Sequence, residues 1–182
     1  MKYRLFCLLV LGLFLFPGTS LAQDDGTVPI TPTSPPVADY PLPYPGILPN
    51  NPLYPIKMVR DKVILLLITD PYKKAQFNLL QADKRIEAAI FLVNDDKKNG
   101  QLAVTTIEKG ENYYHDAVAD ALALKKEGRN MGSFLHDLDR AATKHISLMT
   151  NLQKILPEQR KELSLLKARM QSYQLQVIQV KE

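Results

Sequence analysis

The sequence predicts an all-α protein: an antiparallel bundle of four to five helices with a buried apolar helix, preceded by a signal peptide and a proline-rich tether. Apolar residues recur at intervals of three and four over most of residues 71–180. Prolines and polar turns divide that stretch into helix-length pieces, and residues before 48 lack the periodicity. The expected organisation is a signal peptide at 1–22, a disordered tether at 23–47 and a helical domain at 48–182.

The first 22 residues have the layout of a secretory signal. Lys2 and Arg4 form the basic end, Leu5–Phe16 form an apolar core of twelve residues, and Ser20-Leu21-Ala22 is a small-x-small cleavage site. Because a bilayer span needs about 20 residues, cleavage is favoured over retention as an anchor. We expect an extracytoplasmic protein, secreted or held in the periplasm or cell envelope, with no stable membrane span after cleavage. The single cysteine, Cys7, would leave with the leader.

Charge argues against a nucleic-acid partner. Losing Lys2 and Arg4 lowers the formal net charge from +4 to +2, and the remaining acids and bases are interspersed.

The tether is defined by its prolines, of which ten lie between residues 23 and 55. This composition favours extended polyproline II conformations. A plain disordered leader is preferred over a spacer or a ligand for an aromatic groove. Tyr40, Tyr44 and Tyr54 are placed to anchor the end of the segment on the body.

The helical domain opens with a segment around which the rest is expected to pack. Its helix begins either at Pro52, capped by Asn51, or at Pro55. Val63–Ile68 is a run of six apolar residues, which predicts a helix covered on every face. A buried strand is the less favoured alternative, since no second run could pair with it. Asp70-Pro71 ends this helix and starts the next.

Four amphipathic helices are expected to follow. The first ends at the polar turn 94–100, with Gly100 as its terminator, and the second ends at Gly128. Ser133 is expected to cap the third, and Pro157 separates the third from the last. Gly110 lies inside the second helix, where glycine costs about 1 kcal/mol relative to alanine. The apolar stripes contain Ala75, Leu79, Ala82, Ile86, Ala89, Val93; Leu102, Ile107, Tyr114, Val118, Ala121, Leu122; Leu138, Ala142, His145, Met149, Leu152, Leu156; and Leu163, Leu166, Met170, Tyr173, Val177, Val180.

No catalytic, cofactor-binding or metal site is predicted, and the protein is not expected to be an enzyme. The chain lacks nucleophile-elbow, phosphate-loop and zinc-protease motifs. His115 lies four residues after Glu111, and His136 lies three before Asp139; both pairs are interpreted as solvated helix faces. No carboxylate falls within an apolar run, where burial would raise its pKa.

His145 differs because it falls on the apolar stripe of its helix. The preferred interpretation is a core histidine whose ring is hydrogen-bonded to a carbonyl or a tyrosine hydroxyl, with Tyr173 in the same core. The alternative is a pH-sensitive packing residue, since protonating a buried imidazole is unfavourable.

The segment LPNNPLYPIKMVRDKVILLLITDPYKKAQFNLLQADKRIEAA resembles the opening motif of a bacterial exported family known as domain of unknown function 5667. The later KHISLMTNLQKILPEQR is also similar, and together they cover most of residues 48–175. Ile86 stands where members carry Leu. The resemblance implies an exported helical protein and no assigned activity. The matching residues are Pro52, Leu53, Tyr54, Pro55, Lys57, Asp70, Pro71, Arg85 and Glu87.

The expected function is a non-catalytic binding or scaffold module of the cell envelope, whose partner is an unidentified protein or envelope component. The alternative is an extracytoplasmic stress-responsive protein, chaperone-like or metal-binding. An exposed apolar groove would favour the chaperone, and a bundle apolar only inside would favour the scaffold. The oligomeric state stays open.

Overall fold

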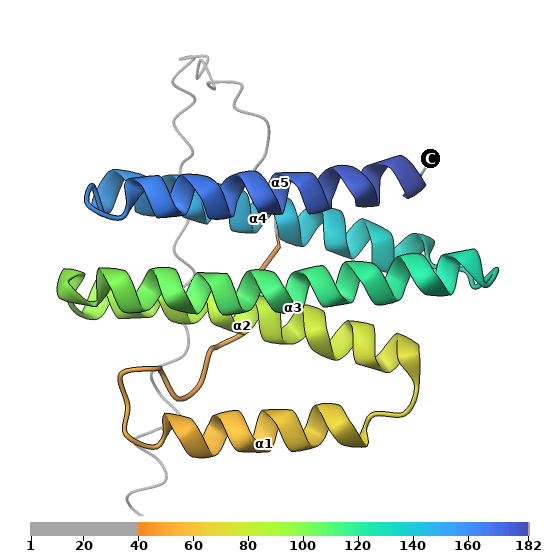
Figure 1. Cartoon of the computed structure of the whole chain (residues 1–182), viewed down its shortest axis with the longest axis horizontal. Coiled ribbons are helices and arrows are strands. Elements are labelled where there is room, and N and C mark those ends of the chain that lie inside the picture. Colours follow the sequence, from red (N-terminus) through yellow and green to blue (C-terminus); the bar gives the residue numbers. More distant parts are fainter. Residues whose placement is uncertain (1–39, 182) are drawn as a thin grey trace, which may run out of the picture. The chain divides into compact units, whose positions relative to one another are not determined.

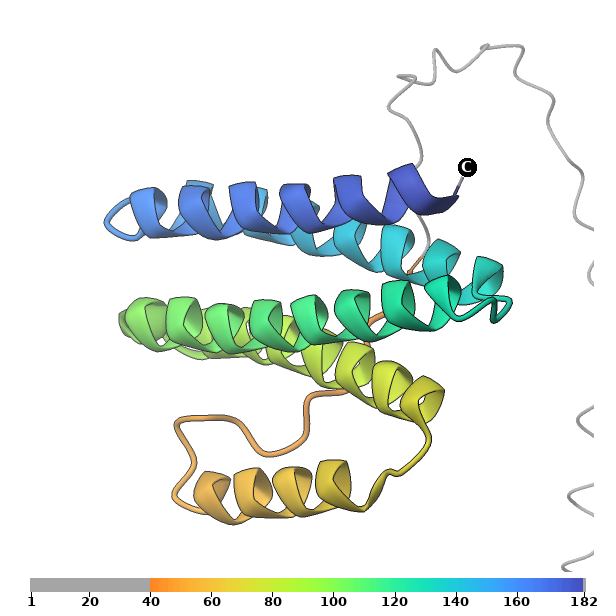
Figure 2. The ribbon, with the colours of Figure 1, turned by 45° about the vertical axis from the view of Figure 1, so that its right-hand side comes forward.

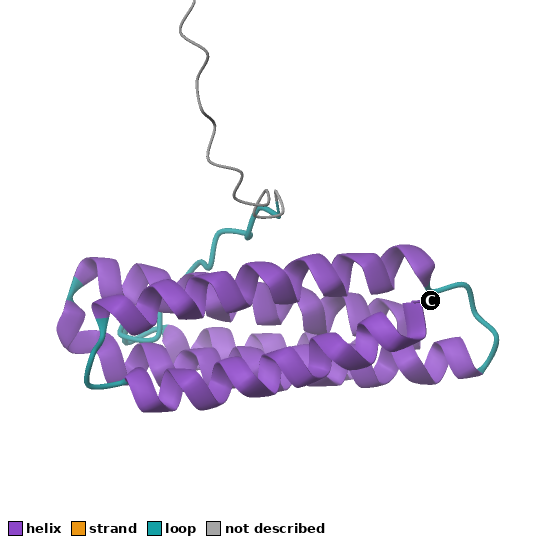
Figure 3. Ribbon diagram, turned by 90° about the horizontal axis from the view of Figure 1, so that it is seen from above, coloured by secondary structure: helices purple, strands orange, loops and turns teal. Residues whose placement is uncertain are grey.

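The computed structural model describes residues 40–181, which form five α-helices joined by short connections (Figure 1). The elements are α1 (Tyr54–Leu67), α2 (Pro71–Asp95), the short 3-10 helix η1 (Lys97–Asn99), α3 (Gly100–Lys126), α4 (Gly132–Ile155) and α5 (Arg160–Lys181). The described part of the chain contains no strand, so the strand alternative for Val63–Ile68 is wrong (Figure 3). The predicted signal peptide and residues 23–39 of the predicted tether lie outside the described residues.

Two antiparallel hairpins build the bundle. Helix α2 packs along α3, and α4 packs along α5; the hairpins meet through α3 against α5 and α2 against α4 (Figure 1). The apolar stripes expected from the sequence supply most of this core, because each helix turns its stripe toward the other three. Fully buried core side chains include Ile86, Leu92, Ile107, Tyr114, Leu135, Leu138, Met149, Leu163 and Met170.

Two helix boundaries follow the expected chemistry. Asp70 caps α2, since its Oδ1 accepts a hydrogen bond from the Lys73 backbone N–H at 2.9 Å. Gly128 has a φ of +83°, and its N–H donates to the Lys125 carbonyl where α3 ends.

Two other boundary predictions are wrong. Gly100 begins α3 instead of ending α2, because Asp96 ends α2 in an extended conformation and then caps η1. Helix α4 begins at Gly132, and no side chain makes the cap hydrogen bond, so Ser133 is not a cap.

Gly110 lies where the backbone of α3 approaches α2 closely. A Cβ atom there would stand 2.9 Å from Cβ of Arg85 and 3.2 Å from the carbonyl oxygen of Ala82. The glycine's conformational cost is therefore offset by a close contact between two helix backbones, which no larger residue permits without movement.

The prediction that the Val63–Ile68 segment is buried among the other helices is wrong. Helix α1 lies at the edge of the bundle, beside α2 and outside the four-helix core (Figure 2). Leu66 and Leu67 are 83% and 73% exposed, whereas Lys57 and Asp61 are 5% and 1% exposed. The helix is amphipathic, and its polar side faces the bundle because a buried arginine on α2 holds it there.

The end of the predicted tether packs on the body. The Tyr40 hydroxyl donates to Oδ2 of Asp83 at 2.7 Å, and the Tyr44 ring meets Phe91 edge-on at 5.9 Å. Tyr54, the first residue of α1, is buried against Arg85 of α2, so all three tyrosines contact the helical body.

A candidate docking face on helix α1

The inward side of α1 carries three buried residues with polar groups, Tyr54, Lys57 and Asp61. They are spaced three and four apart, so they share one face of the helix. All three face α2, where they surround the guanidinium of Arg85.

Arg85 is fully buried and touches α1 along more than one turn. Its Nη2 lies 3.6 Å from Oδ2 of Asp61 and donates to Sδ of Met58 at 3.0 Å. Its Cζ lies 5.5 Å from the ring centroid of Tyr54 and 5.9 Å from that of Tyr113 on α3. We call Arg85, Tyr54, Met58 and Asp61 the arginine anchor, since these contacts fix which side of α1 faces the bundle.

Cations outnumber anions around the arginine anchor. Burial and, to a smaller extent, the positive charge of Arg85 lower the pKa of Lys57 to about 8. Within residues 40–181, Nζ of Lys57 and Nε and Nη1 of Arg85 have no hydrogen-bond partner. Such incompletely paired buried charge orients a helix without adding much stability.

The outward side of α1 is an apolar stripe. Its members, spaced three, four, three and one apart, share one face of the helix. All are roughly half exposed or more. We define the α1 stripe as Ile56, Val59, Val63, Leu66 and Leu67.

The rims of the α1 stripe are cationic. Arg60 lies on one side and Lys62 on the other, and both are exposed. Arg60 also pairs with Oδ1 of the buried Asp61 at 2.7 Å. Pro55, Ile56, Val59 and Arg60 line a shallow, mostly apolar depression of about 430 Å³. An aliphatic surface between two cations can bind a partner through apolar contact, with orientation set by charge.

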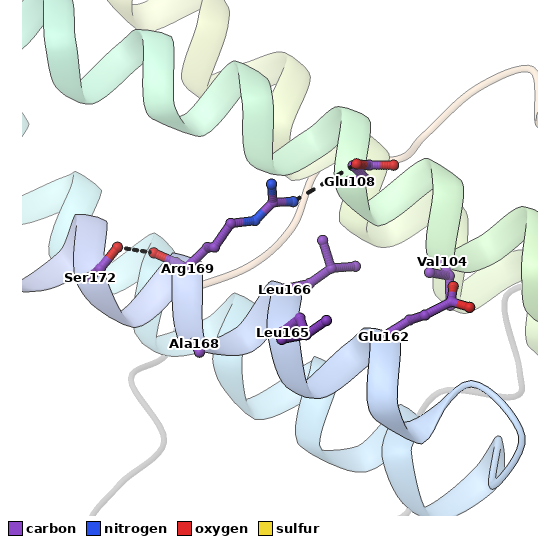
Figure 4. Close-up of a pocket in the computed structure, with 8 residues that line it drawn as sticks. All are labelled: Val104, Glu108, Glu162, Leu165, Leu166, Ala168, Arg169 and Ser172. Carbon is purple, nitrogen blue, oxygen red and sulfur yellow. Dashed lines mark hydrogen bonds and ion pairs between the residues drawn. The ribbon is translucent and has the colours of Figure 1, made fainter.

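A second apolar surface lies between α3 and α5. Val104, Leu165, Leu166 and Ala168 line an open groove of about 620 Å³, rimmed by Glu108, Glu162, Arg169 and Ser172 (Figure 4). Leu165 is largely exposed.

Glu111, next to this groove, is a buried carboxyl that the sequence did not predict. It is 1% exposed, and its Oε2 accepts a hydrogen bond from Nη2 of Arg169 at 2.6 Å. Burial raises the pKa of Glu111 to about 7, although Arg169 opposes the shift. Glu111 lies between Gly110 and Asn112, outside any apolar run, so the absence of carboxylates from those runs did not reveal this buried one. Glu111 lies one position after Gly110, on the α3 side that meets α5, and sequence spacing alone gave no sign of that neighbour.

The remaining candidate histidines stay on the surface. His115 does not pair with Glu111: its Nδ1 lies 3.3 Å from Asp116, and its ring packs on Tyr173 at 5.1 Å. His136 is exposed, and the neighbouring Asp139 accepts from Lys181 and Gln174. No three His, Cys, Asp or Glu side chains within residues 40–181 are grouped to hold a metal ion.

His145 is fully buried, as its position on the stripe predicts. Its Nε2 lies 2.8 Å from Oδ1 of Asp83, so the partner is a carboxylate and neither a carbonyl nor a tyrosine hydroxyl. The aromatic neighbour of the His145 ring is Tyr114, 6.0 Å away. Tyr173 packs on the same core, as predicted, and its ring contacts His115. Asp83 also accepts from Tyr40, which makes this cluster a structural link between α2, α4 and the segment before α1.

These features define an all-α bundle carrying an outer amphipathic helix. The model of the family described as "Domain of unknown function (DUF5667)" matches residues 46–159, and the chain belongs to this family. Tyr54, Lys57 and Arg85, three of the residues on which the resemblance rests, meet at the arginine anchor or beside it. No curated protein and no solved structure matches the chain. Among the described helices, none combines the length and apolar character needed to cross a bilayer.

Proposed function

We propose that the protein is a non-catalytic binding module of the cell envelope, acting on the extracytoplasmic side through the α1 stripe. The observation that carries the proposal is the orientation of α1: Lys57 and Asp61 are buried against the bundle, and the aliphatic residues of the α1 stripe face outward. Exposing such a face to water is unfavourable, and contiguous apolar surfaces of this kind commonly mark docking sites. The leader supports the location.

Site-specific photo-crosslinking tests this proposal. A photoreactive residue at Leu66 should give discrete adducts in the native envelope. Leu175, an exposed leucine on α5, provides the matched control position and should give few. Equal labelling at the two positions would contradict a docking role for the α1 stripe.

A chaperone-like activity is the second candidate, and the groove between α3 and α5 favours it. The groove is apolar inside and charged at its rim, as a site for unfolded segments would be. The purified protein should then slow the aggregation of a denatured client. Leu165→Asp should abolish that effect while Leu175→Asp preserves it. Equal activity of the two variants would exclude the groove as the client site.

A further inference from the structure

We propose that the α1 stripe docks on an anionic lipid surface, with α1 lying flat in the headgroup region. This inference rests on the proposed function, because it names the partner of the same docking face. The protein would be peripheral: α1 would enter the interface without crossing the bilayer.

Charge complementarity is the first argument. From Leu53 to Thr69 the only carboxylate is Asp61, which is buried between Arg85 at 3.6 Å and Arg60 at 2.7 Å. The solvent-facing side of α1 therefore carries aliphatic side chains, two cations and no exposed carboxylate. Lys62 is long enough to leave its stem on the apolar surface and reach phosphate groups at its edge. On the other rim, the Arg60 side chain pairs with Asp61 and is still 59% exposed, so it also presents positive charge. Lysine and arginine near an anionic membrane strengthen binding, each by about fivefold.

Position is the second argument. Helix α1 is at the edge of the bundle, so a flat surface can approach the stripe along its length (Figure 2). Fourteen residues at 1.5 Å each make a helix about 21 Å long. An apolar stripe with cationic rims on a helix in this position is the arrangement of interfacial membrane helices.

A second copy of the chain fits the stripe less well. In an antiparallel pair of α1 helices, equivalent rim positions face each other, so Arg60 would oppose Arg60 and Lys62 would oppose Lys62. Self-association would thus place like charges along both rims, whereas an anionic surface would satisfy them.

Vesicle flotation tests the inference on the protein purified in its exported form. Vesicles of phosphatidylcholine alone are compared with vesicles that also contain phosphatidylglycerol. The protein should float with the anionic vesicles, and added salt should weaken its binding. Leu66→Asp should lower the partition coefficient by about tenfold, and the control Leu175→Asp should not change it. Lys62→Gln should lower binding by about fivefold on anionic vesicles only, whereas Lys161→Gln on α5 should leave it unchanged.

Equal binding to neutral and anionic vesicles, or equal binding by Leu66→Asp and Leu175→Asp, would overturn the inference. So would a concentration-dependent dimer that Leu66→Asp abolishes in protein that does not float; the partner would then be a second copy. If flotation fails but crosslinks at position 66 persist, the lipid partner is wrong and the docking function stands. If both fail, the docking function is wrong too.

Discussion

Arg85→Met tests whether the arginine anchor sets the orientation of α1. The substitution keeps an unbranched side chain of similar length and removes the positive charge beside Asp61, which is 1% exposed. Breaking a buried ion pair from one side costs about 3–5 kcal/mol, and each lost cation–π contact adds about 0.5–2 kcal/mol. Asp61 keeps its 2.7 Å ion pair with Arg60, and Lys57 on the same face offsets part of the remaining negative charge, so the cost lies at the low end of this range. We therefore expect a loss of about 3 kcal/mol.

The loss should be local, because α1 can lift away without opening the four-helix core. Hydrogen exchange of the α1 amides should accelerate strongly, while the amides of α5 keep most of their protection. Asp61→Leu combined with Arg85→Met should restore much of that protection, since an apolar pair of similar volume avoids the unpaired charge. Unchanged exchange in α1, with urea melts within about 0.5 kcal/mol of the parent, would refute the anchor.

Three further predictions follow from the structure. Leu66→Asp should melt within about 0.5 kcal/mol of the parent because Leu66 is exposed, whereas Leu163→Asp in the core should unfold the protein; similar thermal melts would contradict the placement of α1. Because folding raises the pKa of Glu111 from 4.5 to about 7, the folded state binds that proton more tightly, and stability should fall by at most about 3 kcal/mol as pH rises across this interval. Glu111→Gln should remove that fall in urea melts between pH 5 and pH 8, and parallel curves for parent and variant would show that Glu111 does not titrate differently on folding. Intact-mass measurement of the exported protein should show loss of residues 1–22; a full-length, membrane-bound species would contradict cleavage of the leader.

The sequence predicted the parts of the fold that depend on one helix at a time. Each of α2 to α5 carries a continuous apolar stripe, and a stripe determines which side of a helix is buried when the neighbours are apolar too. The Asp70 cap and the Gly128 terminator were predictable for the same reason, because their chemistry is local.

The orientation of α1 was not predicted because it depends on a charge that another helix supplies. The run Val63–Ile68 suggested burial on every side, yet the spacing of Tyr54, Lys57 and Asp61 already marked a second, polar face. Only Arg85, buried on α2, decides which face turns inward. The exposed apolar stripe of α1 was not predicted for this reason. The burial of Glu111 was not predicted because its partner, Arg169, comes from a distant part of the chain.

Gly110 links the packing of α3 to the orientation of α1. The glycine lies directly behind Arg85, the residue whose guanidinium contacts Tyr54, Met58 and Asp61 of α1. A methyl group there would lie 2.9 Å from Cβ of Arg85, so either Arg85 or α3 would have to move. A substitution at Gly110 on α3, a helix that does not carry the α1 stripe, would thus disturb the contacts that orient α1.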